Sequence, residues 1–242
     1  MSAAAKRRWF IFLMLLFPLL HFLVFFVYIN ANTVVMSFQR LNFMDNSVSF
    51  VGLDQYRAIF RDLERSPVLG KAIVNSLLFI PVTNFILLPL SIVAGYFLYK
   101  KVWGSGWFRA VFFLPSILSI VILTMVFSFM FDSTFGVVND LLRLVGLEHW
   151  QRAWFGDPDT AMPMVFLYCI WAGIGFNVIL LHGAISRIPT EIIEYGQLEG
   201  ISMTRELWQV IVPMIWPTIT TLFVLGSTSA FTIFFQPQLL TN

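Results

Sequence analysis

The chain has 242 residues, of which 58% are hydrophobic and only 12% charged, and its formal net charge is +2. Soluble domains carry about a quarter charged residues, so this composition excludes a single soluble domain and predicts a polytopic membrane protein. No basic cluster is longer than Lys6-Arg7-Arg8, so nothing indicates a nucleic-acid surface. The single cysteine, Cys169, excludes a disulfide framework.

Five uncharged apolar runs approach or exceed the roughly 20 residues that cross a bilayer as a helix. They cover residues 9–29, 72–99, 110–131, 161–186 and 218–235. The first run is too long for a signal-peptide core and lacks a small-residue cleavage site, so it is expected to be retained. Pro81 and Pro89 predict a kink in the second run.

Two polar loops separate these runs, at residues 37–71 and 132–160, and a short helix is expected within each, the second near residues 137–145. We therefore divide the chain into residues 1–71, a first span with its loop, and residues 72–242, the helical core. A cytoplasmic N-terminus places both dense basic clusters, at residues 6–8 and 100–101, inside the cell, as the positive-inside rule favours.

A polar segment within residues 187–213 interrupts the apolar core. Thr190 is expected to cap a short helix, Gly200 to end it in the left-handed region, and Ser202 to cap a second helix that stops or kinks near Val212. An apolar stripe at three-residue spacing consists of Ile192, Tyr195, Leu198 and Ile201. An acidic and polar stripe consists of Glu191, Glu194 and Gln197. On pattern alone, this segment could equally be an amphipathic helix in the membrane interface.

Several absences restrict the function. The five runs contain no ionisable Asp, Glu, Lys or Arg, which argues against an ion-coupled carrier. No G-x-x-x-x-G-K-[ST] motif is present, so the chain is not expected to hydrolyse nucleotides. The three histidines are isolated from one another, and no catalytic or metal-binding set stands out.

The sequence from Glu194 to Gly200, followed by Pro213 and Pro217, resembles the EAA loop of binding-protein-dependent ABC importer permeases. That pattern reads E-A-A-x-x-D-G-A, with Leu-Pro about a dozen residues later and a further proline after that. Glu199 replaces Asp and Val212 replaces Leu, while Tyr195, Gly196 and Ile201 depart from the alanines. The segments at residues 114–116, 135–139, 154–161 and 170–177 are similar to the carbohydrate-importing branch, so the resemblance covers most of residues 114–242.

This resemblance implies an all-α polytopic helical bundle of the type I ABC importer permease kind, with about five spans present and a sixth missing after Asn242. The implied function is that of a transmembrane permease subunit that moves a carbohydrate or related polar solute inward by ATP-driven alternating access. The residues expected to couple to the ATPase are Glu191, Glu194, Tyr195, Gly196, Glu199, Gly200 and Pro213. The residues expected along the substrate pathway are Gly173, Gly175, Asn177, Gly226, Ser227, Thr228 and Ala230. For any one of the pathway residues, the competing explanation is close helix packing by small residues, with the Ser and Thr hydroxyls bonded back to the backbone.

The implied partners are a second permease in a heterodimer, an ATPase subunit dimer, an extracytoplasmic solute-binding protein and membrane lipid. No catalytic residue, metal or cofactor is expected in this chain, because ATP and Mg would be bound by the ATPase. The implied location is the bacterial cytoplasmic membrane. The alternative function is a secondary transporter or channel for a small solute, which would take up its solute without ATP or a separate binding protein.

Overall fold

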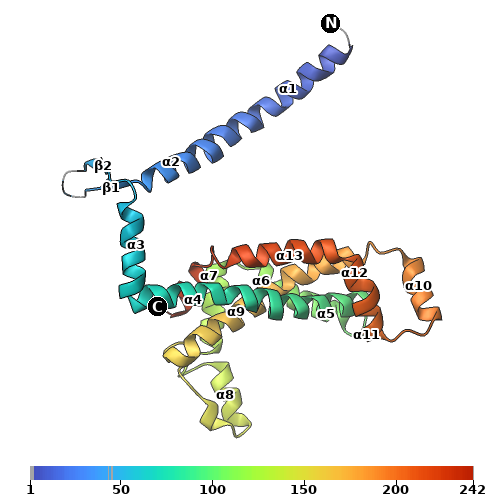
Figure 1. The fold of residues 1–242 in the computed structure, drawn as a ribbon. Coiled ribbons are helices and arrows are strands. Elements are labelled where there is room, and N and C mark those ends of the chain that lie inside the picture. The colour runs from blue at the N-terminus through green and yellow to red at the C-terminus, as the bar shows by residue number, and fades with distance from the viewer. Residues whose placement is uncertain (1–2, 43, 45, 242) are drawn as a thin grey trace. The chain divides into compact units, whose positions relative to one another are not determined.

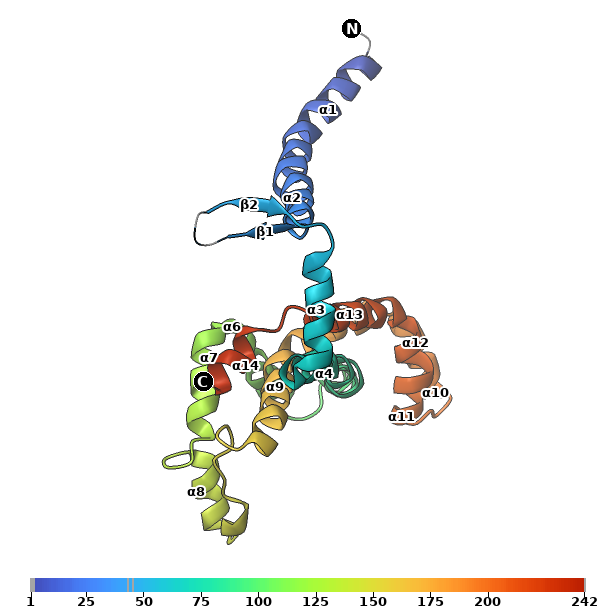
Figure 2. The ribbon, with the colours of Figure 1, turned by 60° about the vertical axis from the view of Figure 1, so that its left-hand side comes forward.

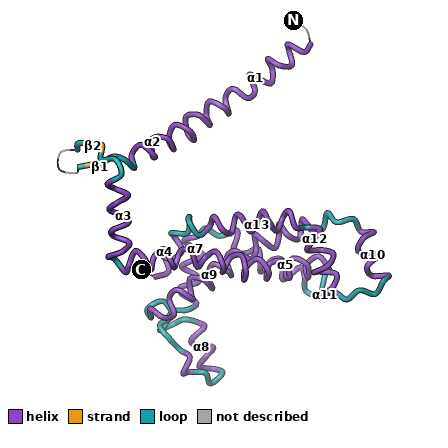
Figure 3. The backbone as a smooth tube through the Cα atoms, in the orientation of Figure 1, coloured by secondary structure: helices purple, strands orange, loops and turns teal. Residues whose placement is uncertain are grey.

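The computed structural model describes residues 3–42, 44 and 46–241, and the chain separates into two units, Met1–Ala72 and Ile73–Asn242. Figure 1 shows that helices make up most of both units, and Figure 3 shows the two short strands as the exception. Helices predominate because a chain in lipid must satisfy its backbone hydrogen bonds within each segment.

The first unit begins with a long apolar helix built from α1 (Ala3–Phe22), a π segment η1 (Leu23–Tyr28) and α2 (Ile29–Met36). No part of its most apolar window is buried within the described chain, so lipid or another protein must cover it. A small antiparallel hairpin follows, in which β1 (Gln39–Leu41) pairs with β2 (Val48–Phe50), and α3 (Asp54–Arg65) comes next.

A second long helix runs through α4 (Pro67–Pro81), the π segment η2 (Val82–Leu87) and α5 (Leu88–Tyr99). We predicted an irregularity in this helix from Pro81 and Pro89. The structure has the π segment η2 there, between the two prolines. The third long helix, α9 (Pro158–Ile185), is uninterrupted.

The predicted third span, residues 110–131, is not one straight helix. The structure has α6 (Ser105–Ile117) and α7 (Ile120–Met130), bent by 115° from one another. The physical reason is local, since Leu118 and Ser119 are extended and the Ser119 side chain accepts a hydrogen bond from the Ile122 amide, which starts a new helix. The described residues thus include three helices that are long and apolar enough to cross a membrane, or up to five if each bent pair is one span.

In the second bent pair, the first helix precedes the last predicted span and the second helix forms most of that span. It consists of the short helix α11 (Met203–Arg205), the π segment η4 (Glu206–Ile211) and α12 (Val212–Met214), followed after a 77° bend by α13 (Trp216–Ser229). The bend lies at Ile215, three residues after Val212, near which we expected the helix to stop or kink. Pro213 lies directly after the π segment η4, within a helix that continues from Met203 to Met214. The helix also ends at Ser229, six residues before the predicted limit.

Three shorter helices complete the second unit: α8 (Val137–Leu144), as predicted, α10 (Thr190–Leu198) and α14 (Phe235–Thr241). A 3-10 turn, η3 (Glu148–Trp150), lies between α8 and α9. Figures 1 and 2 both place α8 and α10 at opposite ends of this unit.

Two hydrophobic clusters hold the second unit together. One joins α5, the end of α9, α10, η4 and α13. The other joins α4, α7, the start of α9 and α14, and includes the buried rings of Phe79, Phe127 and Tyr168.

Candidate functional site

The segment of residues 187–213, which we call the coupling loop, lies at the end of the second unit where α5 ends and α13 begins (Figure 1). Gly200 has φ +69°, and the Ile201 amide donates to the Gly196 carbonyl, so α10 ends at a left-handed glycine. The Ser202 side chain accepts from the Arg205 amide and starts the next helix. Both of these predictions are confirmed. The predicted Thr190 cap is wrong, because the helix begins at Thr190 itself and Pro189 occupies the cap position without a side-chain bond.

One residue attaches α10 to the core, and the remainder of its apolar side faces outward. Ile193 is buried in the first hydrophobic cluster, whereas Ile192, Tyr195 and Leu198 are exposed, Leu198 by 84%. The carboxylates that we predicted to couple, Glu191, Glu194 and Glu199, are also exposed. The helix therefore presents an apolar and acidic surface with nothing from the described chain covering it.

Gly196 permits the close contact between α10 and the residue after Gly200. A Cβ atom at Gly196 would lie 2.7 Å from the Cδ1 atom of Ile201. An alanine at this position, as in the EAA pattern, would require the terminal methyl group of Ile201 to move.

A buried ion pair that we did not predict links the coupling loop to the second span. The Glu206 side chain is 3% exposed, and its two carboxylate oxygens lie 2.6 and 2.8 Å from the Nζ atom of Lys100, which follows α5. The ammonium also lies 5.7 Å from the centre of the Tyr96 ring. The two partners are 106 residues apart in the chain, so no local sequence pattern indicates the pair.

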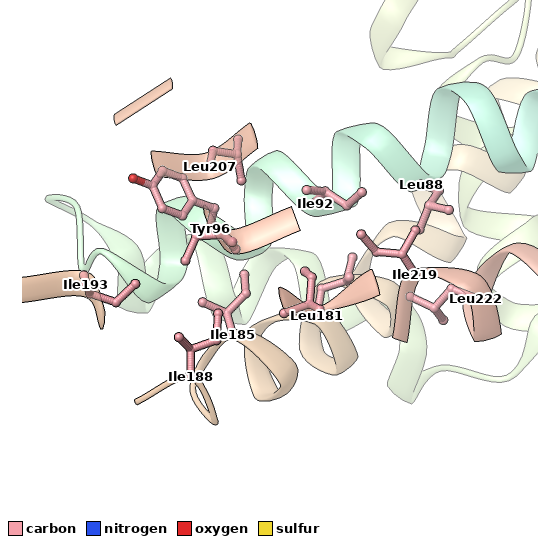
Figure 4. Packing of buried hydrophobic residues seen from close by; sticks show 12 residues of the cluster. Leu88, Ile92, Tyr96, Leu181, Ile185, Ile188, Ile193, Leu207, Ile219 and Leu222 are labelled. Carbon is pink, nitrogen blue, oxygen red and sulfur yellow. The ribbon is translucent and has the colours of Figure 1, made fainter. Parts of the chain in front are cut away.

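Apolar packing extends from the loop into the last span. Leu207 and Ile211 of η4 belong to the same buried cluster as Ile215, Ile219 and Leu222. Figure 4 shows Leu207 beside Tyr96 at one end of this cluster, and Ile219 and Leu222 near Leu88 at the other. The coupling loop and α13 therefore share one close-packed cluster.

A cavity of about 430 Å³ lies where η2, α6, α7, α9, α13 and the start of α14 meet. Among the residues predicted along the substrate pathway, it is lined by Gly173, Asn177 and Gly226. The side chains of Asn177 and of Gln236, which also lines the cavity, make no hydrogen bond within the described part of the chain. Each therefore has a free amide donor and acceptor for a polar solute.

The other four predicted pathway residues do not line this cavity. Gly175 packs against α6, where a Cβ atom would overlap the carbonyl oxygen of Phe112. Ala230 is buried in the second hydrophobic cluster. The hydroxyls of Ser227 and Thr228 donate to the carbonyls of Phe223 and Leu225, the backbone bonding that we gave as the competing explanation.

Asn84 in η2 is a further residue that sequence reasoning missed. It is 4% exposed, and its Nδ2 atom donates to the Ser227 hydroxyl at 2.8 Å. Its Oδ1 atom would lie 2.6 Å from a Cβ atom at Gly226, and the neighbouring Thr83 hydroxyl is 3.2 Å from the Gly226 carbonyl oxygen. Polar contacts thus join the π segment to α13 beside the cavity. The sequence signal for Asn84 was its polar amide within a largely apolar run, since polar side chains are costly inside a membrane-spanning helix.

Residues 87–242 match the model of the family described as binding-protein-dependent transport system inner membrane component. The chain belongs to this family. The permease is 31% identical to a probable ABC transporter permease, YurN of Bacillus subtilis, over 94% of its own length and 77% of the relative's. It is 30% identical to the arabinooligosaccharides transport system permease AraP of Halalkalibacterium halodurans, over 86% of its length and 65% of the relative's.

Among solved structures, the permease is similar to a chain of a bacterial ABC transporter involved in the import of the acidic polysaccharide alginate. The TM-score is 0.80 at 25% identity, and the match covers 98% of the permease and 78% of that chain. These results confirm the predicted helical bundle of the type I importer permease kind. The protein is a multi-pass membrane component of a binding-protein-dependent transport system, and it is a transporter subunit and not an enzyme.

Proposed function

We propose that the permease forms part of an importer for a carbohydrate in the bacterial cytoplasmic membrane, with its N-terminus in the cytoplasm. The solute class is supported by relatives named for arabinooligosaccharides and multiple sugars, and by the alginate transporter. The proposed partners are a second permease, two ATPase subunits that bind ATP and Mg, and an extracytoplasmic solute-binding protein. A solved alginate transporter in complex with a periplasmic protein supports the last of these.

The observation that carries the proposal is the continuous packed core from α10 through η4 to α13, which is anchored by the Lys100–Glu206 pair and ends beside the cavity. The uncovered surface of α10 would fit a cleft in the ATPase. Closure of the ATPase dimer would move this surface, and the packed core would carry α13 with it. The cavity would then alternate between the two sides of the membrane.

The exposed surface of α10 supplies the first test. We expect Leu198→Asp to abolish capture of the ATPase by the affinity-purified permease complex, because a carboxylate would replace the most exposed apolar side chain of the proposed contact. Leu144→Asp is the matched control, since Leu144 is 79% exposed on α8 at the opposite end of the unit. Capture that survives Leu198→Asp would contradict docking through this surface.

The cavity supplies a separate test of the solute pathway. We expect Asn177→Ala to raise the KM of uptake by roughly tenfold, because losing one or two hydrogen bonds to a polar solute costs about 1–2 kcal/mol. Thr228→Ala is the matched control, because its hydroxyl is already bonded to the Leu225 carbonyl. Uptake kinetics in proteoliposomes with the purified binding protein measure both. Equal KM values for wild type and Asn177→Ala would exclude this amide from solute binding.

The same proteoliposomes distinguish an importer from a secondary carrier. The proposal requires ATP on the side of the membrane that the coupling loop faces. It requires the binding protein on the opposite side. Uptake driven by an ion gradient alone, without either component, would favour the carrier.

A further inference from the structure

Two adjoining cavities lie at the same end of the second unit as the coupling loop. One, of about 380 Å³, is formed by the end of α5, the start of α6 and the end of α9. The other, of about 350 Å³, extends along α5 and α6. Leu98 and Ser105 line both, so the two cavities are neighbours.

The first cavity is basic. Lys101 and Arg109 line it, no acidic residue does, and neither cation forms an ion pair among the described residues. The Arg109 guanidinium contacts the Nε2 atom of His182 at 3.0 Å, which leaves its other donors available. Two uncompensated cations in one recess favour an anion.

The position of this recess relative to the bilayer follows from its aromatic neighbours. Trp103 and Trp107 lie between the two cations in sequence and are 95% and 78% exposed. Exposed tryptophans at the end of a spanning helix are typical of the level of the lipid headgroups. Lys101 and Gly104 both have positive φ, and the Ser105 amide donates to the Val102 carbonyl, so a tight turn holds this arrangement.

The second cavity is apolar. Apart from Ser105, its lining is hydrophobic, and Leu90, Phe97 and Phe108 are each about half exposed. From Leu90 to Phe97 the groove follows α5 for about 10 Å at 1.5 Å per residue. An apolar groove next to a basic recess matches the chemistry of a phospholipid, whose apolar acyl chain is attached to an anionic headgroup.

We propose that the two cavities together bind an anionic phospholipid. Its phosphate lies between Lys101 and Arg109, and one acyl chain lies in the groove between α5 and α6. Basic pockets between spanning helices are a known basis for recognition of anionic headgroups. The occupied site is adjacent in sequence to Lys100, so the lipid contacts the turn that carries the partner of Glu206.

The test uses the full transporter complex in nanodiscs that contain equal amounts of phosphatidylglycerol and phosphatidylcholine, with bound lipid measured by native mass spectrometry. We expect wild type to retain phosphatidylglycerol preferentially. The double variant K101Q/R109Q should weaken this retention by about 25-fold, since each cation near a headgroup contributes about a factor of five. Its matched control is R61Q/R65Q, which removes two exposed cations from α3 in the first unit.

A second variant tests the chain groove without changing charge. Ala94 lines the apolar cavity, so Ala94→Trp would fill it and should also release phosphatidylglycerol. Elution of each variant as an intact complex shows that it has folded. Undiminished retention in either variant overturns the proposal. Displacement of the lipid by soluble glycerol 3-phosphate would also overturn it, because a free phosphate compound would then be the ligand. Cross-linking of the Phe97→Cys variant to the second permease would overturn it as well, because a protein would then occupy the groove.

Discussion

Replacing Glu206 by alanine is expected to destabilise the permease by about 3–5 kcal/mol, because it leaves the ammonium of Lys100 largely buried without its counter-charge. For a chain of this size, 1 kcal/mol corresponds to about 2–4 °C in Tm, so the Tm of the purified complex should fall by roughly 10 °C. ATP-driven uptake should fall with it, since the coupling loop would lose its polar anchor to α5.

A double-variant cycle at Lys100 and Glu206 distinguishes two causes of a lower Tm. One is the loss of the ion pair, and the other is the loss of the packing contacts of the Glu206 side chain. Lys100→Met in the Glu206→Ala background should restore most of the lost stability, because no buried charge then remains unpaired. Asp54→Ala is the matched control, since it breaks the exposed pair with Arg57 and should change stability by about 1 kcal/mol at most. A Tm for Glu206→Ala equal to that of wild type would show that the pair does not anchor the loop.

Replacing Gly175 by alanine is expected to prevent correct assembly of the second unit. The new Cβ atom would overlap the carbonyl oxygen of Phe112 and lie 3.4 Å from the Cα atom of Phe113, and backbone atoms cannot move aside as a flexible side chain can. The close packing of α6 on α9 would therefore have to open. We expect aggregation or loss of the monodisperse complex, which size-exclusion chromatography measures.

Gly183→Ala provides the control for this prediction in the same helix. No atom lies within 4 Å of a Cβ atom built at Gly183, so alanine there should be tolerated, and its higher helix propensity is favourable by up to about 1 kcal/mol. If the two alanine variants behave alike, the close contact between α9 and α6 does not limit assembly.

The sequence alone determined the features that depend only on residues close together in the chain. Membrane insertion follows from uncharged apolar runs of sufficient length. The end of α10 at Gly200 and the start of the next helix at Ser202 follow from the conformational freedom of glycine and the capping ability of serine. The helix at Val137–Leu144 was also predictable from its own residues.

Only the tertiary structure decided which face of each span lines a cavity. In water, an apolar stripe indicates the buried face of a helix, but lipid is as apolar as the protein interior. The helix α9 is apolar all round, so its sequence could not show that Gly173 and Asn177 line the cavity while Gly175 packs on α6. The Lys100–Glu206 pair was hidden for a related reason, because its partners meet across 106 residues through the packing of α5, η4 and α13.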